Sequence, residues 1–342
     1  MYKTLLRPLL FLFYPEKIHK IIIIAIILAH RIPFAPWLFR KMYSMESPGL
    51  EKKFLGLKFR NPIGLAAGFD KNAKFFREFS NFGFGFIEIG TITPLAQPGN
   101  PKPRSFRLPK DKALINRMGL NNLGVDCAIK LLQKRDPDLI IGGNIGKNTL
   151  TPDERAVDDF VYCFEKLYEY VDYFVVNISC PNTGEINKLQ DQTVMEAILG
   201  EIMARRAVKQ LQKPVLLKLS PDLNEIQIDE ALSIIQKLKI DGVVATNTTV
   251  KRNGLTSSKE MIDKIGNGGL SGAPLQARSN EVIRYISKRT DGELPIIGVG
   301  GIMSVEDVLE KFEAGAGLIQ IYSGFIYEGP SIVKRILRSI LN

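Results

Sequence analysis

The sequence predicts a (β/α)8 barrel, in which eight parallel strands alternate with helices and close into a cylinder. Eight short apolar runs recur between residues 63 and 324, each of the length of a buried strand. Amphipathic patterns such as "DDFVYCFEKLYEYV" and "IDEALSIIQKLK" fill the gaps, as helices that cover a parallel sheet would. Eight units favour a closed barrel over an open, doubly wound sheet. The predicted strands lie in residues 63–68, 84–91, 139–146, 173–179, 214–220, 241–249, 295–301 and 317–324.

The residues before these runs have a different character. Residues 1–60 carry eleven Lys and Arg against three Glu, a net charge of +8 out of the +10 of the whole chain. Two apolar runs, 9–13 and 21–29, lie among these cations, and Pro15 suits the first turn of a helix. The basic charge therefore belongs to the N-terminal segment, for which we expect two helices.

This predicted cap, residues 1–40, is expected to rest on an anionic membrane surface rather than to bind nucleic acid, because its cations flank apolar helices. The run 21–29 would rise roughly 13 Å as a helix, whereas the hydrocarbon core of a bilayer is about 30 Å thick. The alternatives are a signal peptide, for which no cleavage site of small residues stands out, and a buried core helix. Residues 41–342 would form the barrel as one domain.

Polar and glycine residues collect after the carboxyl ends of the predicted strands. In a (β/α)8 barrel these ends share one face, where the active site is built. A chance distribution would place such residues at both ends of the strands. The residues concerned are Lys71, Thr91, Asn144, Asn177, Cys180, Asn182, Lys218, Thr246, Asn247, Gly300, Gly301, Tyr322 and Ser323.

Two glycine-rich stretches come close to nucleotide-binding loops without meeting their requirements. In "GGNIGKNT" a Walker motif would need glycine at Ile141 and Ser or Thr at Asn148. In "GVGGIM" Met303 stands where a dinucleotide fingerprint has its last glycine. After the seventh strand of a barrel, however, "GVGG" and the "YSG" after the eighth suit a phosphate held by backbone amides. One phosphate pocket without an adenine signature predicts a mononucleotide cofactor.

Proton transfer in the barrel has to proceed without histidine, because His19 and His30 both lie in the predicted cap. Cys180, in "SCPN" after the fourth strand, is the candidate base, since neighbouring lysines lower the pKa of a thiol. The alternative at Cys180 is a small buried residue, which is the interpretation of Cys127 and Cys163. Three cysteines without C-x-x-C spacing also predict neither disulfides nor a metal site.

Asparagines dominate the remaining polar residues at the strand ends. An amide side chain donates and accepts at once, which suits a flat heterocycle with alternating N–H and C=O groups. The loop "INRMGL", residues 115–120, places Asn116, Arg117 and two backbone amides together. Asn121 and Asn122 are equally well explained as turn residues.

With these residues in view, the sequence resembles the dihydroorotate dehydrogenases, flavin enzymes of pyrimidine synthesis, along essentially its whole length. The resemblance is carried by "NPIGLAAGFDKN", "GFIEIGTITPLAQPGNPKPRSFRL", "LINRMGLNNLGVD", "NIGKNTLTP", "VVNISCPNT", "VATNTT", "GGLSGAPLQ", "PIIGVGGI" and "LIQIYSGFIYEGP". It implies a (β/α)8 barrel that binds FMN and oxidises dihydroorotate to orotate. Cys180 would take the C5 proton while hydride leaves C6 for the flavin.

The resemblance also implies roles for individual residues. The flavin would be lined by Ala67, Gly68, Phe69, Asp70, Lys71, Thr91, Asn144, Asn177, Lys218 and Thr246. Its phosphate region would be held by Gly272, Gly301, Tyr322 and Ser323. The substrate would contact Lys71, Asn116, Arg117, Met118, Gly119, Leu120, Asn177, Asn182, Asn247 and Thr248. No metal is implied.

The predicted cap, with its "YPEKIHK" stretch, is similar to that of the quinone-linked class of this family. His19, Arg107 and Tyr322 would then lie at a quinone tunnel, and the protein would be peripheral on the cytoplasmic side of the cell membrane. Two departures concern the site. That class usually carries serine where Cys180 stands, and "NTGEINKLQ" lacks its usual "TPGLR"-like stretch. Leu120 also replaces a more frequent aromatic residue.

Three other functions are open at this point. The nearest is a soluble dihydroorotate dehydrogenase that uses fumarate or NAD, with which the cysteine agrees and the cap does not. A flavin-dependent tRNA-dihydrouridine synthase is a second, although about 18 residues after the last strand leave room only for a helix. A non-catalytic membrane-binding module is the third, and it would not explain Cys180, Lys71 and Lys218 at strand ends.

Overall fold

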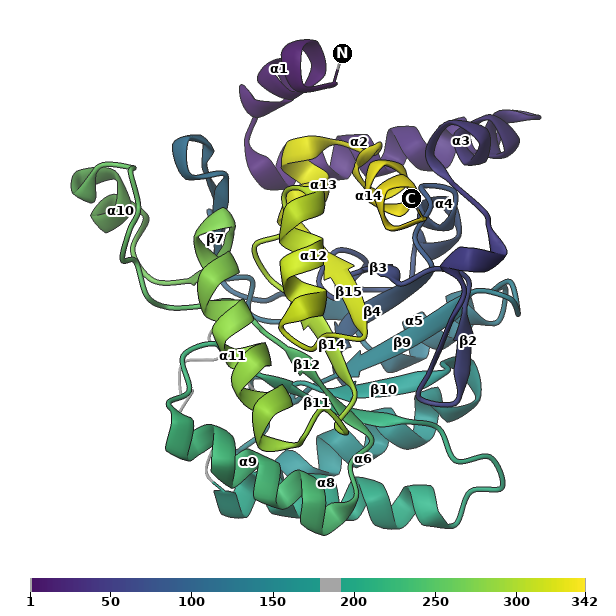
Figure 1. Ribbon diagram of the computed structural model, residues 1–342, viewed down its shortest axis with the longest axis vertical. Coiled ribbons are helices and arrows are strands. Elements are labelled where there is room, and N and C mark those ends of the chain that lie inside the picture. The colour runs from purple at the N-terminus through teal and green to yellow at the C-terminus, as the bar shows by residue number, and fades with distance from the viewer. Residues whose placement is uncertain (1, 179–191, 342) are drawn as a thin grey trace.

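Eight parallel strands form a closed ring in the computed structural model, which describes residues 2–178 and 192–341 (Figure 1). Around the ring the strands follow the order β10, β11, β12, β14, β15, β3, β4 and β9. Each coincides with one of the eight predicted runs, so the predicted barrel is confirmed. Their bounds are β3 (Ile63–Leu65), β4 (Phe86–Ile92), β9 (Ile140–Ile145), β10 (Tyr173–Val176), β11 (Val215–Leu219), β12 (Gly242–Ala245), β14 (Ile296–Val299) and β15 (Leu318–Ile321).

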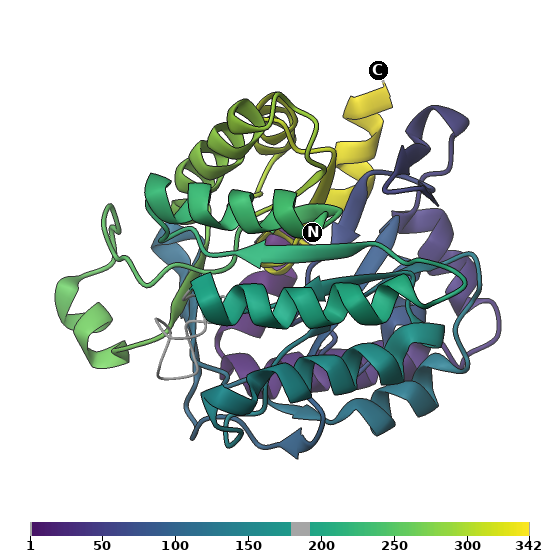
Figure 2. The ribbon, with the colours of Figure 1, turned by 90° about the horizontal axis from the view of Figure 1, so that it is seen from below.

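Helices cover the outside of the barrel, as the two views of the ribbon show (Figures 1 and 2). Two of them begin with a capping box, in which a polar side chain before the helix and one in its first turn bond to each other's backbone. These boxes are Asn224 with Gln227, and Ser304 with Asp307. The helices are α4 (Phe76–Ser80), α5 (Val125–Leu132), α6 (Ala156–Leu167), α8 (Gln192–Ala207), α9 (Glu225–Leu238), α11 (Gln276–Arg289), α12 (Val305–Glu313), α13 (Ser323–Glu328) and α14 (Ile332–Leu341).

The strands bury both of their faces, which explains why they are apolar throughout. On β12, Val244 points into the barrel interior, where it packs with Phe86 and Tyr173, whereas Val243 packs in the layer between strands and helices. Phe59, fully buried, belongs to the interior cluster. It comes from a hairpin of β1 (Lys52–Phe54) and β2 (Leu57–Phe59) that precedes the first barrel strand.

Two further small sheets arise from the connections between barrel elements. An antiparallel sheet joins β6, β7 and β13, although β13 is separated from β7 by about half the chain. This sheet was not predicted, because its strands are short and β13 comes from a distant segment of the chain. The second sheet pairs β5 with β8 in antiparallel fashion. The bounds of these strands and of the helix before β13 are β5 (Ala96–Gln97), β6 (Ser105–Leu108), β7 (Ala113–Asn116), β8 (Asn122–Leu123), β13 (Gly269–Gly272) and α10 (Lys259–Ile265).

The N-terminal residues 2–43, called the cap from here on, lie beside the C-terminal helices α13 and α14 (Figure 1). They contain a π-helical turn, η1 (Tyr2–Leu6), followed by α1 (Arg7–Phe11), α2 (Pro15–Ala29) and α3 (Ala35–Tyr43). The expected helices are α1 and α2. The third, α3, was not expected, and it extends the helical segment beyond residue 40. Among the described residues, no helix is long and apolar enough to cross a bilayer.

Candidate active site at the barrel mouth

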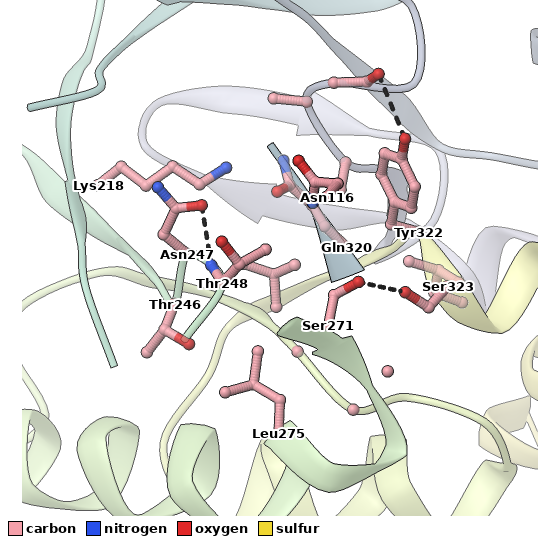
Figure 3. Close-up of a pocket in the computed structure, with 18 of the residues that line it drawn as sticks. Asn116, Lys218, Thr246, Asn247, Thr248, Ser271, Leu275, Gln320, Tyr322 and Ser323 are labelled. Carbon is pink, nitrogen blue, oxygen red and sulfur yellow. Dashed lines mark hydrogen bonds between the residues drawn. The ribbon is translucent and has the colours of Figure 1, made fainter. Parts of the chain in front are cut away.

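A cavity opens at the carboxyl ends of the barrel strands, a region called the barrel mouth below. It holds about 1040 Å³ of empty space including its opening, which suits a cofactor and a small substrate. Figure 3 shows side chains from β7, β11, β13 and β15, and from the segment that follows β12, that converge on it. The predicted residues that line the cavity are Ala67, Gly68, Lys71, Thr91, Asn116, Met118, Leu120, Asn177, Lys218, Thr246, Asn247, Thr248, Gly272, Gly301, Tyr322 and Ser323.

A chain of side-chain hydrogen bonds runs across the floor of the cavity. The amide of Asn247 donates to Asn177 (3.4 Å), and Asn177 donates to the hydroxyl of Thr91 (2.9 Å). Thr91 in turn donates to Asn144 (2.6 Å), and Asn144 donates to Glu88 (2.8 Å). The bonds leave each of these buried groups with a partner, so they fix the orientation of the amides that face the cavity.

Glu88, at the end of this chain, was not predicted as a site residue. It is fully buried, and it accepts hydrogen bonds from Gln320 (2.6 Å) and from the ammonium of Lys218 (3.4 Å). The carboxylate therefore compensates the charge of Lys218, and it fixes the side chain of Gln320, which lines the cavity. A lone acid in the apolar strand "FIEIGT" was the signal that could have identified it.

Lys71 brings a second ammonium to the cavity. It donates to the backbone carbonyl of Gly68 (2.5 Å). Burial, together with the nearby guanidinium of Arg104, lowers the pKa of Lys71 to about 8, while Glu16 and Asp70 oppose that shift. At neutral pH the side chain is still mostly charged, and Lys71 can hold an anionic group in the cavity.

One side of the cavity is lined by glycines that leave no room for a side chain. A Cβ atom on Gly301 would collide with the backbone of Gln276, and one on Gly324 with the carbonyl of Ile302. Gly272 and Gly301 also have positive φ angles of 105° and 78°, which glycine adopts without strain. Glycine is therefore required here by the close packing of neighbouring segments, and these residues present backbone rather than side chains to the cavity.

Two hydroxyls stand beside these glycines. Ser271 and Ser323 are hydrogen-bonded to each other (2.9 Å; Figure 3). Ser271 was not predicted, and its strand β13 reaches the site only through the unexpected antiparallel sheet. Gly300, which was expected at this end of the barrel, lines the cavity too, and further lining residues that were not predicted are Ala66, Leu275, Val299, Ile302, Gln320, Ile321 and Gly324.

The segment 116–120, called the substrate loop below, is brought only partly into the cavity. Asn116, Met118 and Leu120 line it, whereas Arg117 turns away and donates to the carbonyls of Ile265 (2.6 Å) and Asn267 (2.8 Å). Gly119, with a φ of 68°, contributes its backbone to the loop rather than to the cavity wall. Alternate residues of the loop thus face the cavity.

Three residues expected at the flavin lie behind the cavity wall. Asp70 is fully buried, and its carboxylate accepts the N–H groups of Lys74 (2.8 Å) and Phe75 (2.9 Å). Burial raises the pKa of Asp70 to about 6, against the opposing effect of these bonds. Phe69 packs among aromatic rings, and Asn144 reaches the cavity only through Thr91.

Of the three residues expected at the quinone tunnel, His19 and Arg107 lie on opposite sides of the third, Tyr322. The ring of Phe69 contacts Tyr322 and His19, each with 5.2 Å between ring centroids. On the other side, Tyr322 packs in a cluster with Phe11, over whose ring the guanidinium of Arg107 lies at 4.5 Å. Burial, helped by the charge of Lys71, lowers the pKa of His19 to about 4. Burial raises the pKa of Tyr322 to about 12, so both groups are neutral at physiological pH.

Cys180 and Asn182 lie outside the described residues. The other two cysteines are not among the residues that line the cavity, and Cys163 is fully buried among apolar side chains, where burial raises the pKa of its thiol. Within residues 2–178 and 192–341, no group of three or more His, Cys, Asp and Glu side chains is arranged to hold a metal ion.

Relatives of known name match the chain from end to end. The dihydroorotate dehydrogenase (quinone) of Christiangramia forsetii is 50% identical over 341 residues, which cover 100% of this chain and 99% of the relative. That of Gloeobacter violaceus is 49% identical over 337 residues, which cover 98% of this chain and 93% of the relative. The relatives thus include the N-terminal cap as well as the barrel.

Solved structures agree with the sequence comparison. The ligand-free DHODH of Eimeria tenella is 35% identical, with a TM-score of 0.82 over 90% of this chain and 92% of that one. The same protein in complex with ferulenol gives a TM-score of 0.80 over 90% of this chain and 89% of that one. The family model described as dihydroorotate dehydrogenase matches residues 49–342. With the barrel, the polar strand ends and these matches in agreement, the chain belongs to the dihydroorotate dehydrogenase family.

Proposed function

We propose that the cavity at the barrel mouth binds FMN and dihydroorotate, and that the protein oxidises dihydroorotate to orotate and passes the electrons to a membrane quinone. The activity is that of the family, and the names of the full-length relatives support quinone over fumarate or NAD as the acceptor. The observation that carries the proposal is the composition of the cavity. It combines two lysines, a row of amides and a glycine-lined cradle on one face of the barrel.

The described residues fit FMN in three respects. The crowded Gly272, Gly301 and Gly324, with the hydroxyls of Ser271 and Ser323, would hold a phosphate. Asn177, Asn247 and Gln320 line the cavity with amides that donate and accept, as a heterocycle with N–H and C=O groups requires. Lys218 would place a positive charge beside the ring. When bound, the flavin accepts a hydride from the substrate and supplies electrons to the quinone.

The polar side chains beside this flavin site would orient the substrate. Lys71 would pair with its carboxylate, and Asn116, Asn177, Asn247 and Thr248 would pair with its ring amides, whose donors and acceptors alternate. Asn177, three residues before Cys180 in the sequence, lines the cavity. This position supports Cys180 as the base that takes the C5 proton.

The cap would bring the quinone to the flavin. The rings of His19, Phe69 and Tyr322 form a continuous contact from α2 to the cavity wall, and Arg107 lies beyond Tyr322. The neutral His19 and Tyr322 are compatible with a lipid-soluble ligand, because a charged side chain there would oppose an apolar molecule.

The outer surface of the cap supports a peripheral location on a membrane, which we propose to be the cytoplasmic side of the cell membrane. Its helices expose large apolar side chains next to Lys17, Lys20, Arg31 and Lys41. Such a surface gains free energy from both the acyl region and anionic headgroups. The exposed apolar residues of the cap are Leu5, Leu6, Leu9, Leu12, Phe13, Tyr14, Ile21, Ile24, Leu28, Ile32, Phe34, Trp37, Leu38 and Met42.

The test is an absorption spectrum of the purified protein followed by turnover with different acceptors. We expect a bound flavin that extracts as FMN, and orotate production that is faster with a ubiquinone or menaquinone analogue than with fumarate or NAD⁺. A protein that carries no flavin, or that turns over fastest with fumarate, would contradict the proposal.

Substitution of Cys180 tests the base. Cys180→Ala is expected to lower turnover by about 10²- to 10⁴-fold, the usual contribution of a positioned base, with the flavin still bound. Cys180→Ser is expected to retain activity with a higher pH optimum, because a hydroxyl is the weaker acid. An unchanged pH profile in the serine variant would refute the thiol as base.

A further inference from the structure

We infer that the ion pair between Glu16 and Arg104 is a positioning link, through which the cap holds the substrate loop in the geometry that binds dihydroorotate. Glu16 belongs to helix α2 of the cap, and Arg104 precedes strand β6 of the barrel. The inference rests on the proposed function, because it concerns how the same cavity binds its substrate. It joins the quinone side of the molecule to the substrate side.

The ion pair itself is buried and close. The Nε atom of Arg104 donates to both carboxylate oxygens of Glu16, at 3.2 and 3.3 Å. The two side chains are only 8% and 11% exposed. Loss of one partner of such a pair leaves the other as an uncompensated buried charge, which is far more costly than the loss of a surface pair.

Arg104 also organises the backbone of the preceding turn. Its Nη1 atom donates to the carbonyls of Pro98 (2.6 Å) and Asn100 (3.0 Å). Gly99, between them, has a φ of 74° and no space for a Cβ atom, because the carbonyl of Met118 and the guanidinium of Arg104 occupy it. The turn 98–100 is therefore closed around the arginine side chain.

This turn and Arg104 together hold the substrate loop. The backbone N–H of Asn100 donates to Met118 (3.1 Å), its side-chain amide donates to the carbonyl of Arg117 (3.0 Å), and the N–H of Arg117 donates to the carbonyl of Arg104 (2.9 Å). Met118, whose carbonyl is one of these acceptors, lines the cavity together with Asn116 and Leu120. Each step from Glu16 to the cavity wall is thus a hydrogen bond or an ion pair between described residues.

The same pair acts on Lys71 through its charges. Four ionisable groups influence Lys71 or are influenced by it: Arg104, Glu16, Asp70 and His19. The positive charge of Arg104 lowers the pKa of Lys71, and the negative charge of Glu16 partly offsets this effect. With Glu16 neutralised, Lys71 would lose its proton at lower pH, and the substrate carboxylate would lose its partner in the same range.

Glu16→Gln tests the link, because it keeps the size of the side chain and removes its charge. We expect the KM for dihydroorotate to rise at least about 5-fold, the lower end of usual coupling between sites. The KM for a quinone analogue should change less, and the loss of dihydroorotate binding at high pH should begin at lower pH. Glu51→Gln is the matched control, since Glu51 forms an exposed ion pair with Lys58 (2.8 Å).

A second measurement does not depend on catalysis. Amide hydrogen exchange of residues 113–123 should be faster in Glu16→Gln than in the wild type and in Glu51→Gln. Arg104→Lys, which keeps the charge but cannot make the same set of hydrogen bonds, should have the same effect. If the wild type fails to reduce its flavin with dihydroorotate, the proposed function is wrong, and the exchange comparison still decides on the link. The positioning link would be overturned if hydrogen exchange and the KM for dihydroorotate were both unchanged, or if the KM values for dihydroorotate and for the quinone analogue rose equally.

Discussion

The barrel mouth and the cap depart in opposite directions from the usual distribution of side chains. At the barrel mouth, Glu88, Gln320 and Lys218 are buried although they are polar or charged. In the cap, Phe34 and Trp37 are 83% and 60% exposed although they are aromatic. Buried charges require partners, and exposed apolar patches mark a surface that contacts something else. Each departure is therefore a place where we propose that the protein contacts another molecule.

The two regions differ in whether other residues of the chain satisfy these side chains. At the barrel mouth, most buried polar groups bond to one another, as Glu88 does with Gln320 and Lys218. In the cap, the described residues leave the apolar side chains uncovered. The barrel is thus largely organised before a ligand binds, whereas the exposed apolar side chains of the cap would be buried only by a further surface, which we propose is a membrane.

Removal of Lys218 should give the largest effect, and it tests whether the buried ion pair at the barrel mouth is needed for stability. Lys218→Met leaves the fully buried Glu88 without its cation, which is expected to cost about 3–5 kcal/mol of unfolding free energy. Lys58→Met, which breaks an exposed pair with Glu51, should cost about 0–1 kcal/mol. Denaturant unfolding of the two variants checks the difference, and equal losses would show that the buried pair is not a structural requirement.

The cap side is tested by Trp37→Ala, whose effect should appear in membrane binding. Burial of one large apolar side chain is worth about 1.5–3 kcal/mol, so partition to anionic vesicles should fall roughly 10- to 100-fold. Dihydroorotate oxidation with a water-soluble acceptor dye should be unchanged. Leu150→Ala is the matched control, because Leu150 is 96% exposed but lies outside the cap. An equal loss of vesicle binding in both variants would show that the cap does not bind membranes more strongly than the rest of the surface.

The pH dependence of substrate binding sharpens the comparison at the barrel mouth. Lys71 has a pKa of about 8, so its charge is lost as the pH rises through that value. We expect the KM for dihydroorotate to increase above pH 8, by up to about tenfold for each pH unit. Lys71→Met should bind dihydroorotate weakly at every pH, without this increase. A flat profile in the wild type would exclude Lys71 as the partner of the substrate carboxylate.

The smallest effect is expected from His19, at the contact between the two regions. Its pKa of about 4 in the folded protein lies below the ordinary value of 6.5, so the unfolded chain binds more protons between these pH values. Stability should therefore fall as the pH drops from 6.5 to 4. In His19→Leu this part of the decrease should be absent, as unfolding titrations at several pH values can show.

Much of the fold could be predicted from the sequence because its signals are local. Each barrel strand is an apolar run such as 214–220 or 295–301, and burial on both faces produces that composition without knowledge of the neighbours. The segment α3 was missed because its apolar side chains point outward as well as inward. The antiparallel sheet of β6, β7 and β13 was missed because its strands are short and the pairing of β13 with β7 joins distant segments.

The site was predicted less completely than the fold, for a physical reason. Position after a strand end identified Lys71, Asn177 and Lys218, all of which line the cavity. It could not tell Asp70, whose carboxylate bonds to its own turn, from a residue that faces a ligand. The direction of a side chain in a loop depends on backbone contacts made elsewhere.

The sequence by itself determined the eight strands, their order along the chain and the face that carries the polar residues. Only the tertiary structure decided which polar groups meet. Closure of the ring brings Gln320 of the last strand and Lys218 of β11 to the carboxylate of Glu88, and the docking of α2 brings Glu16 to Arg104. Strands are apolar because each of their residues is buried, and burial selects an apolar side chain at each position independently of the others. A hydrogen bond or an ion pair requires two residues that the fold alone brings together.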